Sequence, residues 1–275
     1  MSRASRHMFR AVMADSPDRL DLACLLIAAE ALPTEGNVDS YLARGVAALD
    51  RLAECVPDEG DPHERLAAVL GDFGGVARDY EALASSLLPE VLRRRRGLPI
   101  LLSTVWTEVA RRVGIAAYGV GLPGHFVVAI GDPATFHPDL PDGSRLLVDP
   151  WSGGRLLRFD AARDLVERTG QPFRRDHLAP AQPVNTVERI LANVRAWADH
   201  PLRAVTRLWA IDLALALPEP PPWLLRDRGL ALRDLGHLPQ SARWLEEYAE
   251  VVEDTSPREA DTARREARGV RARLN

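Results

Sequence analysis

Hydrophobic residues in the first part of the chain recur at the spacing of helices. Apolar side chains return every three or four positions over 20–28 and again over 41–52, which places them on one face of an α-helix. A third stretch of this kind, 62–70, runs into the glycine-rich sequence GDFGGV. The pattern predicts an N-terminal helical subdomain over residues 1–75.

The following segment carries strong helix boundary residues. A helix is predicted over 81–96, ended by Gly97. Pro99 then begins a second helix that runs to Val113, with Gly114 directly beyond it. Proline in the first helical position and glycine just past the last one is the usual asymmetry of helix ends.

Four short apolar runs come next, separated by glycine, proline and aspartate, as is typical of strands joined by turns. They occupy 116–120, 125–130, 145–150 and 154–159, with a turn-rich segment over 131–144 between the second and the third. A helix followed by an antiparallel meander predicts an α+β fold. We assign this core to residues 76–180.

Helical spacing returns after the proline-bearing linker 177–185. The predicted helices cover 190–197, 202–217, 223–235 and 241–252, and a last one starts near 257. Similar residues recur 36 to 39 positions apart, which predicts degenerate tetratricopeptide-like hairpins over 184–275 and a groove for a protein or peptide partner. Tryptophans 197, 209, 223 and 244 are interpreted as core residues of these helices.

Composition excludes several classes of chemistry. The sequence contains no lysine, so a lysine-bearing phosphate loop, a Schiff base and a lysine general base are impossible. The net charge of −4 gives no reason to expect nucleic acid as a partner. The run Arg93–Arg96 is interpreted as the solvated end of a helix, with a patch that binds an anion or nucleic acid as the alternative.

Neither a metal nor a cofactor is expected. Cys24 and Cys55 are the only cysteines and cannot form a zinc site alone, and Cys24 sits in an apolar run typical of a core position. Histidines 63, 137, 177, 200 and 237 have no ligand spacing.

The location of the protein is predicted from its apolar runs. Charged residues interrupt the first twenty positions, so no signal peptide is predicted. The longest apolar run is far shorter than the roughly 20 residues that cross a bilayer. We therefore expect a cytoplasmic protein without a membrane contact, whose oligomeric state the sequence does not define.

One pair of residues carries candidate chemistry. His125 begins the second predicted strand and Asp149 lies near the end of the third. If these strands pair, the two side chains approach each other, and an imidazole oriented by a carboxylate is the base half of a nucleophile–base–orienter triad. The triad still lacks its nucleophile.

The same segment resembles the transglutaminase-like superfamily, and more narrowly its SirB-type bacterial branch with C-terminal tetratricopeptide-like repeats. The resemblance rests on RGLPI (96–100), ARRVG (110–114), PGHF (123–126) and DP (149–150) with the glycines at 153 and 154. It implies a papain-like core of one helix packed on an antiparallel sheet. In active members a cysteine opens that helix, and this position is Pro99 here, as is usual in the SirB-type branch. Ser85-Ser86 stands where that branch more often has Asn-Ser.

The residues leave several roles open. Ser103 is one helical turn beyond Pro99, and we expect its hydroxyl to bond a backbone carbonyl of its own helix rather than to act as a nucleophile. His125 and Asp149 are interpreted as a polar brace, a ligand contact or a catalytic pair. The first hypothesis is accordingly a non-catalytic binding or regulatory scaffold, and the alternative is a hydrolase or acyl transferase that uses this pair with water or another nucleophile.

Overall fold

The first helices of the chain form a layer around an apolar central helix. The computed structural model describes residues 3–31, 37–139 and 145–273. Helix α2 carries apolar residues on all sides and is buried from Ala23 to Ala29, which explains why its neighbours pack around it. Helix α1 has no counterpart among the predicted elements. The N-terminal helices are α1 (Arg3–Asp15), α2 (Leu20–Ala31), α3 (Val38–Glu54) and α4 (Pro62–Leu70).

The predicted helix over 81–96 is wrong in its first half. This region consists of two short 3₁₀ segments, η1 (Ala77–Glu81) and η2 (Leu83–Ser86), followed by helix α5 (Leu88–Arg94). Pro89 lies in the first turn of α5, because proline lacks the N–H that a longer helix would need there. The predicted helix at Pro99 is confirmed as α6 (Pro99–Arg112), and Gly114 beyond it has a φ of +70°.

A small antiparallel sheet packs against α6 and confirms the α+β class. Its four strands follow one another in the order β1-β2-β3-β4. Alternate residues of β2 point to opposite faces: Val128 joins the apolar cluster with α6, whereas Val127 joins a second cluster with Ala162 and Val166. The strands are β1 (Ala117–Val120), β2 (Val127–Ile130), β3 (Leu146–Asp149) and β4 (Arg155–Leu157). Residues 140–144 of the predicted turn lie outside the described residues.

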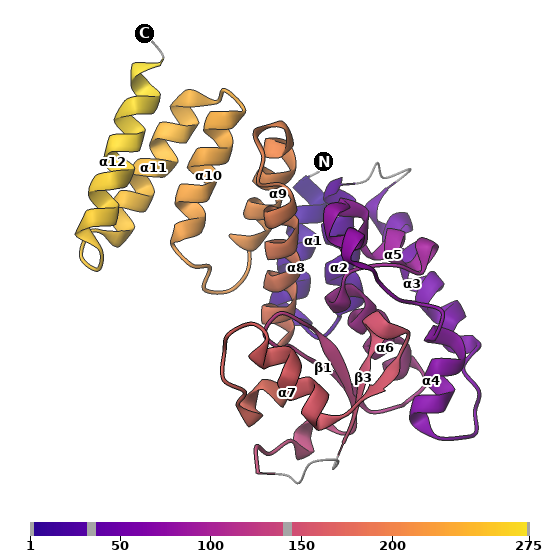
Figure 1. Ribbon diagram of the computed structural model, residues 1–275. Coiled ribbons are helices and arrows are strands. Elements are labelled where there is room, and N and C mark those ends of the chain that lie inside the picture. The colour runs from indigo at the N-terminus through magenta and orange to yellow at the C-terminus, as the bar shows by residue number, and fades with distance from the viewer. Residues whose placement is uncertain (1–2, 32–36, 140–144, 274–275) are drawn as a thin grey trace.

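Helix α7 (Phe159–Glu167) covers the face of the sheet opposite to α6 (Figure 1). The sequence prediction extends the fourth strand to 159 and omits this helix. Phe159, Ala162 and Val166 nevertheless have helical spacing, and Ala162 and Val166 are fully buried. The last predicted strand is therefore too long by its two final residues, because the chain turns into α7.

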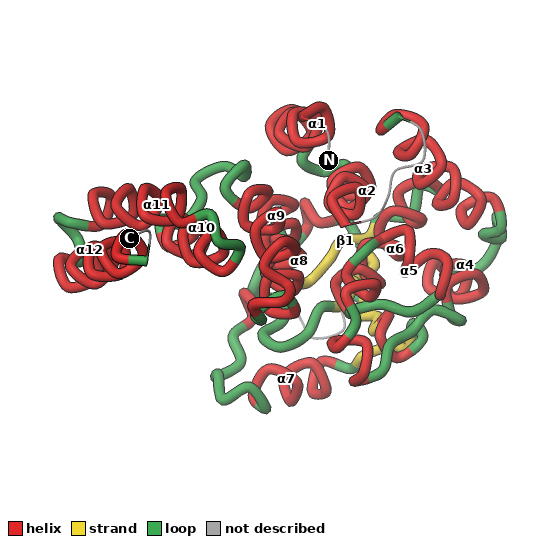
Figure 2. The backbone as a smooth tube through the Cα atoms, turned by 90° about the horizontal axis from the view of Figure 1, so that it is seen from above, coloured by secondary structure: helices red, strands yellow, loops and turns green. Residues whose placement is uncertain are grey.

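The first two of the remaining helices join the main apolar core, and the last three form an extension on one side of the molecule. Helix α8 begins at Pro183, seven residues before its predicted start, because that proline occupies the first turn. In Figures 1 and 2, α10, α11 and α12 lie beside one another and project away from the sheet. The helices are α8 (Pro183–Trp197), α9 (Ala204–Ala214), α10 (Trp223–Asp234), α11 (Leu238–Val252) and α12 (Pro257–Ala272).

The structure corrects the interpretation of one tryptophan. Trp209 is buried as expected, but Trp223 is 44% exposed and carries the guanidinium of Arg195 over its ring. Trp197 is partly buried and Trp244 stacks with Arg228.

The tetratricopeptide-like assignment and the division at residues 75 and 184 stay predictions. In the described part of the chain, no helix has the length and apolarity to cross a bilayer.

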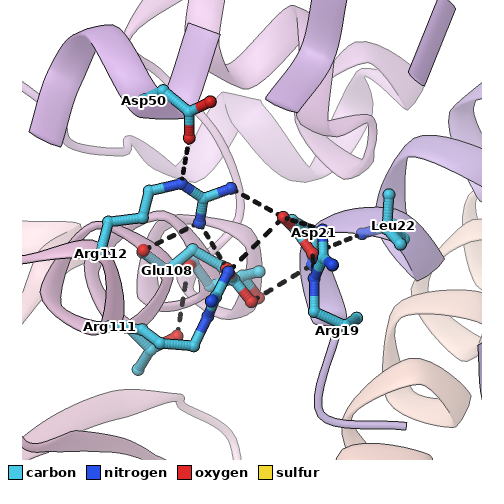
Figure 3. Close-up of polar contacts among 9 residues, drawn as sticks. Arg19, Asp21, Leu22, Asp50, Glu108, Arg111 and Arg112 are labelled. Atoms are coloured by element: carbon cyan, nitrogen blue, oxygen red, sulfur yellow. Dashed lines mark hydrogen bonds and ion pairs between the residues drawn. The ribbon is translucent and has the colours of Figure 1, made fainter. Parts of the chain in front are cut away.

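A buried ionic cluster joins the N-terminal helices to α6. Arg112 donates to Asp21 of α2 at 2.7 Å, to Glu108 of its own helix at 2.6 Å and to Asp50 of α3 at 2.7 Å (Figure 3). The Asp21 side chain is fully buried, and Arg19 donates to it as well. Burial disfavours the carboxylate, but the hydrogen bonds from Arg19 and Arg112 hold the pKa of Asp21 below its ordinary value.

Gly154 marks a close approach between α6 and the loop that precedes β4. Its φ is +75°, and a Cβ there would overlap the buried indole of Trp106. Gly154→Ala is therefore expected to lower the free energy of unfolding by about 3–5 kcal/mol, from backbone strain and overpacking together. Gly114→Ala is the matched control, because φ is +70° and nothing lies within 4 Å of its added Cβ. Urea unfolding should give that variant a loss of only about 1 kcal/mol, and equal losses would contradict the packing argument.

Candidate functional site

Strand pairing brings His125 and Asp149 together. Val128 of β2 lies opposite Val148 of β3, so the residues that precede β2 and end β3 meet at one edge of the sheet. Gly124, with a φ of +73°, turns the chain directly before His125. The Nε2 atom of His125 lies 2.9 Å from Oδ1 of Asp149, and the two side chains are 12% and 11% exposed. The contact expected from the sequence is present.

Asp149 is held by donors from its own turn. The backbone N–H of Trp151 donates to Oδ1 at 3.1 Å, and the hydroxyl of Ser152 donates to Oδ2 at 2.6 Å. Burial alone would raise the pKa of this carboxyl, but the hydrogen bonds from His125 and Ser152 outweigh it and lower the pKa. Ser152 is not among the site residues predicted from the sequence; the bond from the N–H of Trp151, two residues after Asp149, is the common Asx-turn pattern.

The lowered pKa of Asp149 predicts a loss of stability in acid. A carboxyl whose pKa is lower in the folded state stabilises that state fully above the unfolded value of about 3.9, and the contribution disappears as the pH falls through the folded value. Asp149→Asn should cost about 1–3 kcal/mol at pH 5, and this difference from the wild type should shrink steadily as the pH falls below about 4. Urea unfolding across that range measures it, and a constant difference would contradict the assignment.

Arg189 of α8 closes one side of the site. Its Nη2 donates to the backbone carbonyl of His125 at 2.8 Å, and its guanidinium lies 5.5 Å from the centre of the Phe126 ring. Burial lowers the pKa of Arg189, which is consistent with a cation packed against protein rather than held in bulk water. The sequence gives no indication of this contact, because 64 residues separate the two partners.

The first turn of α6 carries no nucleophile. Pro99 is its first residue and is buried. Ser103 is fully buried, and its hydroxyl donates to the carbonyl of Phe126 at 3.3 Å. The prediction that the Ser103 hydroxyl bonds a carbonyl of its own helix is wrong. The neighbouring residue Thr104 makes a bond of this kind, from its hydroxyl to the carbonyl of Ile100. The Ser103 contact places the residue after His125 one helical turn from Pro99.

The other candidate groups lie elsewhere. Cys24 is buried in α2, and burial raises the pKa of its thiol strongly, as expected of a core cysteine. Cys55 is exposed after the end of α3. The Nε2 atom of His63 contacts the carbonyl of Gly154 at 2.8 Å. Within the described ranges, no three His, Cys, Asp or Glu side chains are grouped as metal ligands would be.

Arg93–Arg96 lies at a helix end, as predicted, but not all of its side chains are solvated. Arg93 is 68% exposed and pairs with Glu90, whereas Arg94 is only 26% exposed and bonds Asp79 and Ser85. The Ser85 carbonyl also accepts the N–H of Leu98 at 2.9 Å. These bonds attach η2 to the residue that precedes α6 and so help to fix the helix start beside His125.

Helix α6 on an antiparallel sheet, with a His–Asp pair at the sheet edge, defines a class of protein. The model of the transglutaminase-like superfamily matches residues 41–192, and the chain belongs to this superfamily. The match contains α6, all four strands and the pair. The SirB-type branch stays a prediction.

Similar proteins carry the name UPF0162. The chain is 34% identical over 194 residues to the UPF0162 protein of Xylella fastidiosa strain 9a5c. The aligned region covers 66% of this chain and 64% of that protein. It is 32% identical over 208 residues to UPF0162 protein PA3419 of Pseudomonas aeruginosa, and the aligned region covers 70% of this chain and 71% of that protein. A 24% identical match over 220 residues to UPF0162 protein YchA of Escherichia coli K12 covers 77% and 78%.

Proposed function

We propose that this protein is a non-catalytic member of its superfamily that acts as a binding or regulatory scaffold. The observation that carries the proposal is Pro99 in the first position of α6, where the superfamily resemblance expects the cysteine nucleophile. Proline supplies neither a nucleophile nor an N–H at this helix start. His125 and Asp149 then serve as a brace between two strands and as a ligand contact.

The surroundings of the pair support this assignment. The hydroxyl of Ser103 already donates to Phe126, and the Cys24 thiol is buried in α2. Neither group is available for attack on a substrate beside His125. A catalytic role would therefore need water or a substrate hydroxyl as the nucleophile.

The proposed partner is a protein or peptide that binds the helical extension. Side chains of α10, α11 and α12 line a hollow of about 400 Å³, among them Trp223, Arg226 and Tyr248. Trp, Tyr and Arg are the residues that most often dominate binding energy at protein interfaces. The 44% exposure of Trp223 leaves part of its ring open to such a partner.

The catalytic half of the proposal is tested on the purified full chain. Thiol- and serine-directed probes should leave no adduct between residues 99 and 103. A panel of amide and ester substrates should show no turnover above that of a folded His125→Ala variant. Turnover that disappears in His125→Ala, or an adduct on that turn of α6, would establish an enzyme instead.

The binding half is tested with peptides selected on the immobilised protein from a random library. Selected peptides should lose at least about tenfold in affinity for Trp223→Ala, as for a truncated anchor residue. Leu156→Ala is the control, because Leu156 is 54% exposed on β4, outside the extension. Equal binding by both variants would place the peptides elsewhere and contradict the proposed surface.

A further inference from the structure

A cavity of about 850 Å³ lies between α3 and α5, apart from the His125 site. This volume is within the range of roughly 300–1,000 Å³ typical of small-molecule sites. Its walls are largely apolar, which suits the hydrophobic body of a small molecule. The apolar lining consists of Tyr41, Ala48, Leu52, Phe73, Pro89 and Leu92.

The polar lining of this cavity is strongly cationic. Four arginines contribute to it, at positions 44, 51, 93 and 95, against the single carboxylate of Glu90. The chain as a whole carries a net charge of −4, so the cavity has the opposite sign. Arg93 pairs with Glu90 at 2.6 Å and Arg95 pairs with Asp72 at 2.9 Å, and both arginines are at least half exposed and can turn toward a ligand.

The hydroxyl of Tyr41 lies behind the wall of the cavity. Its oxygen is buried and has no partner among the described residues, and burial raises the pKa of Tyr41 to about 12. Since solvent does not reach this oxygen, the polar contacts that the cavity offers to a ligand are those of its arginines.

We propose that this cavity binds a small organic anion, a carboxylate or a phosphate monoester on an apolar body. The body lies against Leu52 and Leu92, which are partly exposed, and the charged group meets Arg51 and Arg93. Guanidinium groups bind both kinds of oxyanion through parallel N–H bonds. The preference between the two headgroups is decided by experiment.

A matched series of three compounds tests the proposal on the full chain: 2-naphthoate, 2-naphthyl phosphate and the neutral 2-naphthol. Titration calorimetry at pH 7 should show one saturable site for at least one anion, with an affinity at least about tenfold above that of naphthol. The tighter anion identifies the headgroup. Equal binding of naphthol, or no saturable binding of either anion at low millimolar concentration, overturns the proposal.

Variants on the cavity rim locate the site. Arg51→Gln combined with Arg93→Gln should weaken anion binding by at least about tenfold and leave naphthol unchanged. The control removes the same charge elsewhere, by Arg168→Gln with Arg258→Gln, both exposed. Unchanged affinity in the Arg51 and Arg93 double variant overturns the proposed site.

Cys55 gives an independent measurement, because it lines the cavity and is exposed whereas Cys24 is buried. A saturating anion should slow the alkylation of Cys55 by iodoacetamide several-fold, and the control double variant should behave like the wild type. Binding that leaves the alkylation rate of Cys55 unchanged lies outside this cavity and overturns the proposal. The outcome does not depend on the proposed scaffold function, which rests on other residues.

Discussion

Pro99→Cys is expected to create a thiol whose pKa lies at least one unit below the usual value of about 8.5. The first turn of α6 is the positive end of the helix dipole, which favours a thiolate, and the substitution restores the backbone N–H that proline lacks. The Ser103–Phe126 contact joins α6 to the residue after His125, one helical turn beyond Pro99. We therefore expect the imidazole of His125 to lie close enough to pair with the thiolate. The measurement is thiolate absorbance against pH in a Cys55→Ser background, where the buried Cys24 does not titrate near neutrality.

Two further variants separate the helix start from the histidine. Adding His125→Ala to Pro99→Cys should raise the thiol pKa again by about one unit. Ser103→Cys lies one turn deeper, at a fully buried position, so its thiol pKa should exceed the usual value because burial disfavours the charge. An ordinary pKa for Pro99→Cys would mean that this turn does not retain the environment of a nucleophile, and the superfamily alignment at Pro99 would be in doubt.

Arg112→Ala is expected to be the most destabilising of the charge substitutions, by about 3–5 kcal/mol. It would leave the carboxylates of Asp21 and Glu108, which are 0% and 3% exposed, without their buried cation. The remaining partners, Arg19 and Arg111, are 37% and 48% exposed, so they compensate the buried charges only in part. Urea unfolding at pH 7 measures the loss.

Arg111→Ala provides the comparison within the same cluster. Arg111 contacts Glu108 at 2.8 Å and Asp21 at 3.7 Å, but its side chain is 48% exposed. Its removal should therefore cost less than about 1 kcal/mol, as for most solvent-exposed ion pairs. Similar losses for the two variants would show that burial does not set the strength of this cluster.

The sequence predicts the core of the fold because its boundary residues act locally. Pro99 and Gly114 define α6, and the alternation of apolar residues with turn residues locates the strands. The contact between His125 and Asp149 follows from strand pairing alone. The break before α5 was also predictable from Pro89, since a proline inside the expected helix 81–96 cannot supply its backbone hydrogen bond.

Other features depend on contacts between distant segments. Arg189 reaches the His125 carbonyl from α8, and Arg112 joins α2, α3 and α6, but local patterns carry no information on such partners. The cavity between α3 and α5 arises from the same kind of packing. Ser103 illustrates the limit at short range, because its hydroxyl bonds the adjacent sheet segment rather than the helix carbonyl that sequence spacing favours.

The hydrogen bonds of Asp149 fix the tautomer of His125. An ionised carboxylate only accepts, so the hydrogen in the contact between Nε2 and Oδ1 belongs to the imidazole. A neutral imidazole has one N–H, and its other nitrogen, Nδ1, must then carry a lone pair. In the neutral form of the imidazole this nitrogen is therefore an acceptor, and a molecule that binds that form must bring an N–H or O–H group, as the main chain of a peptide does.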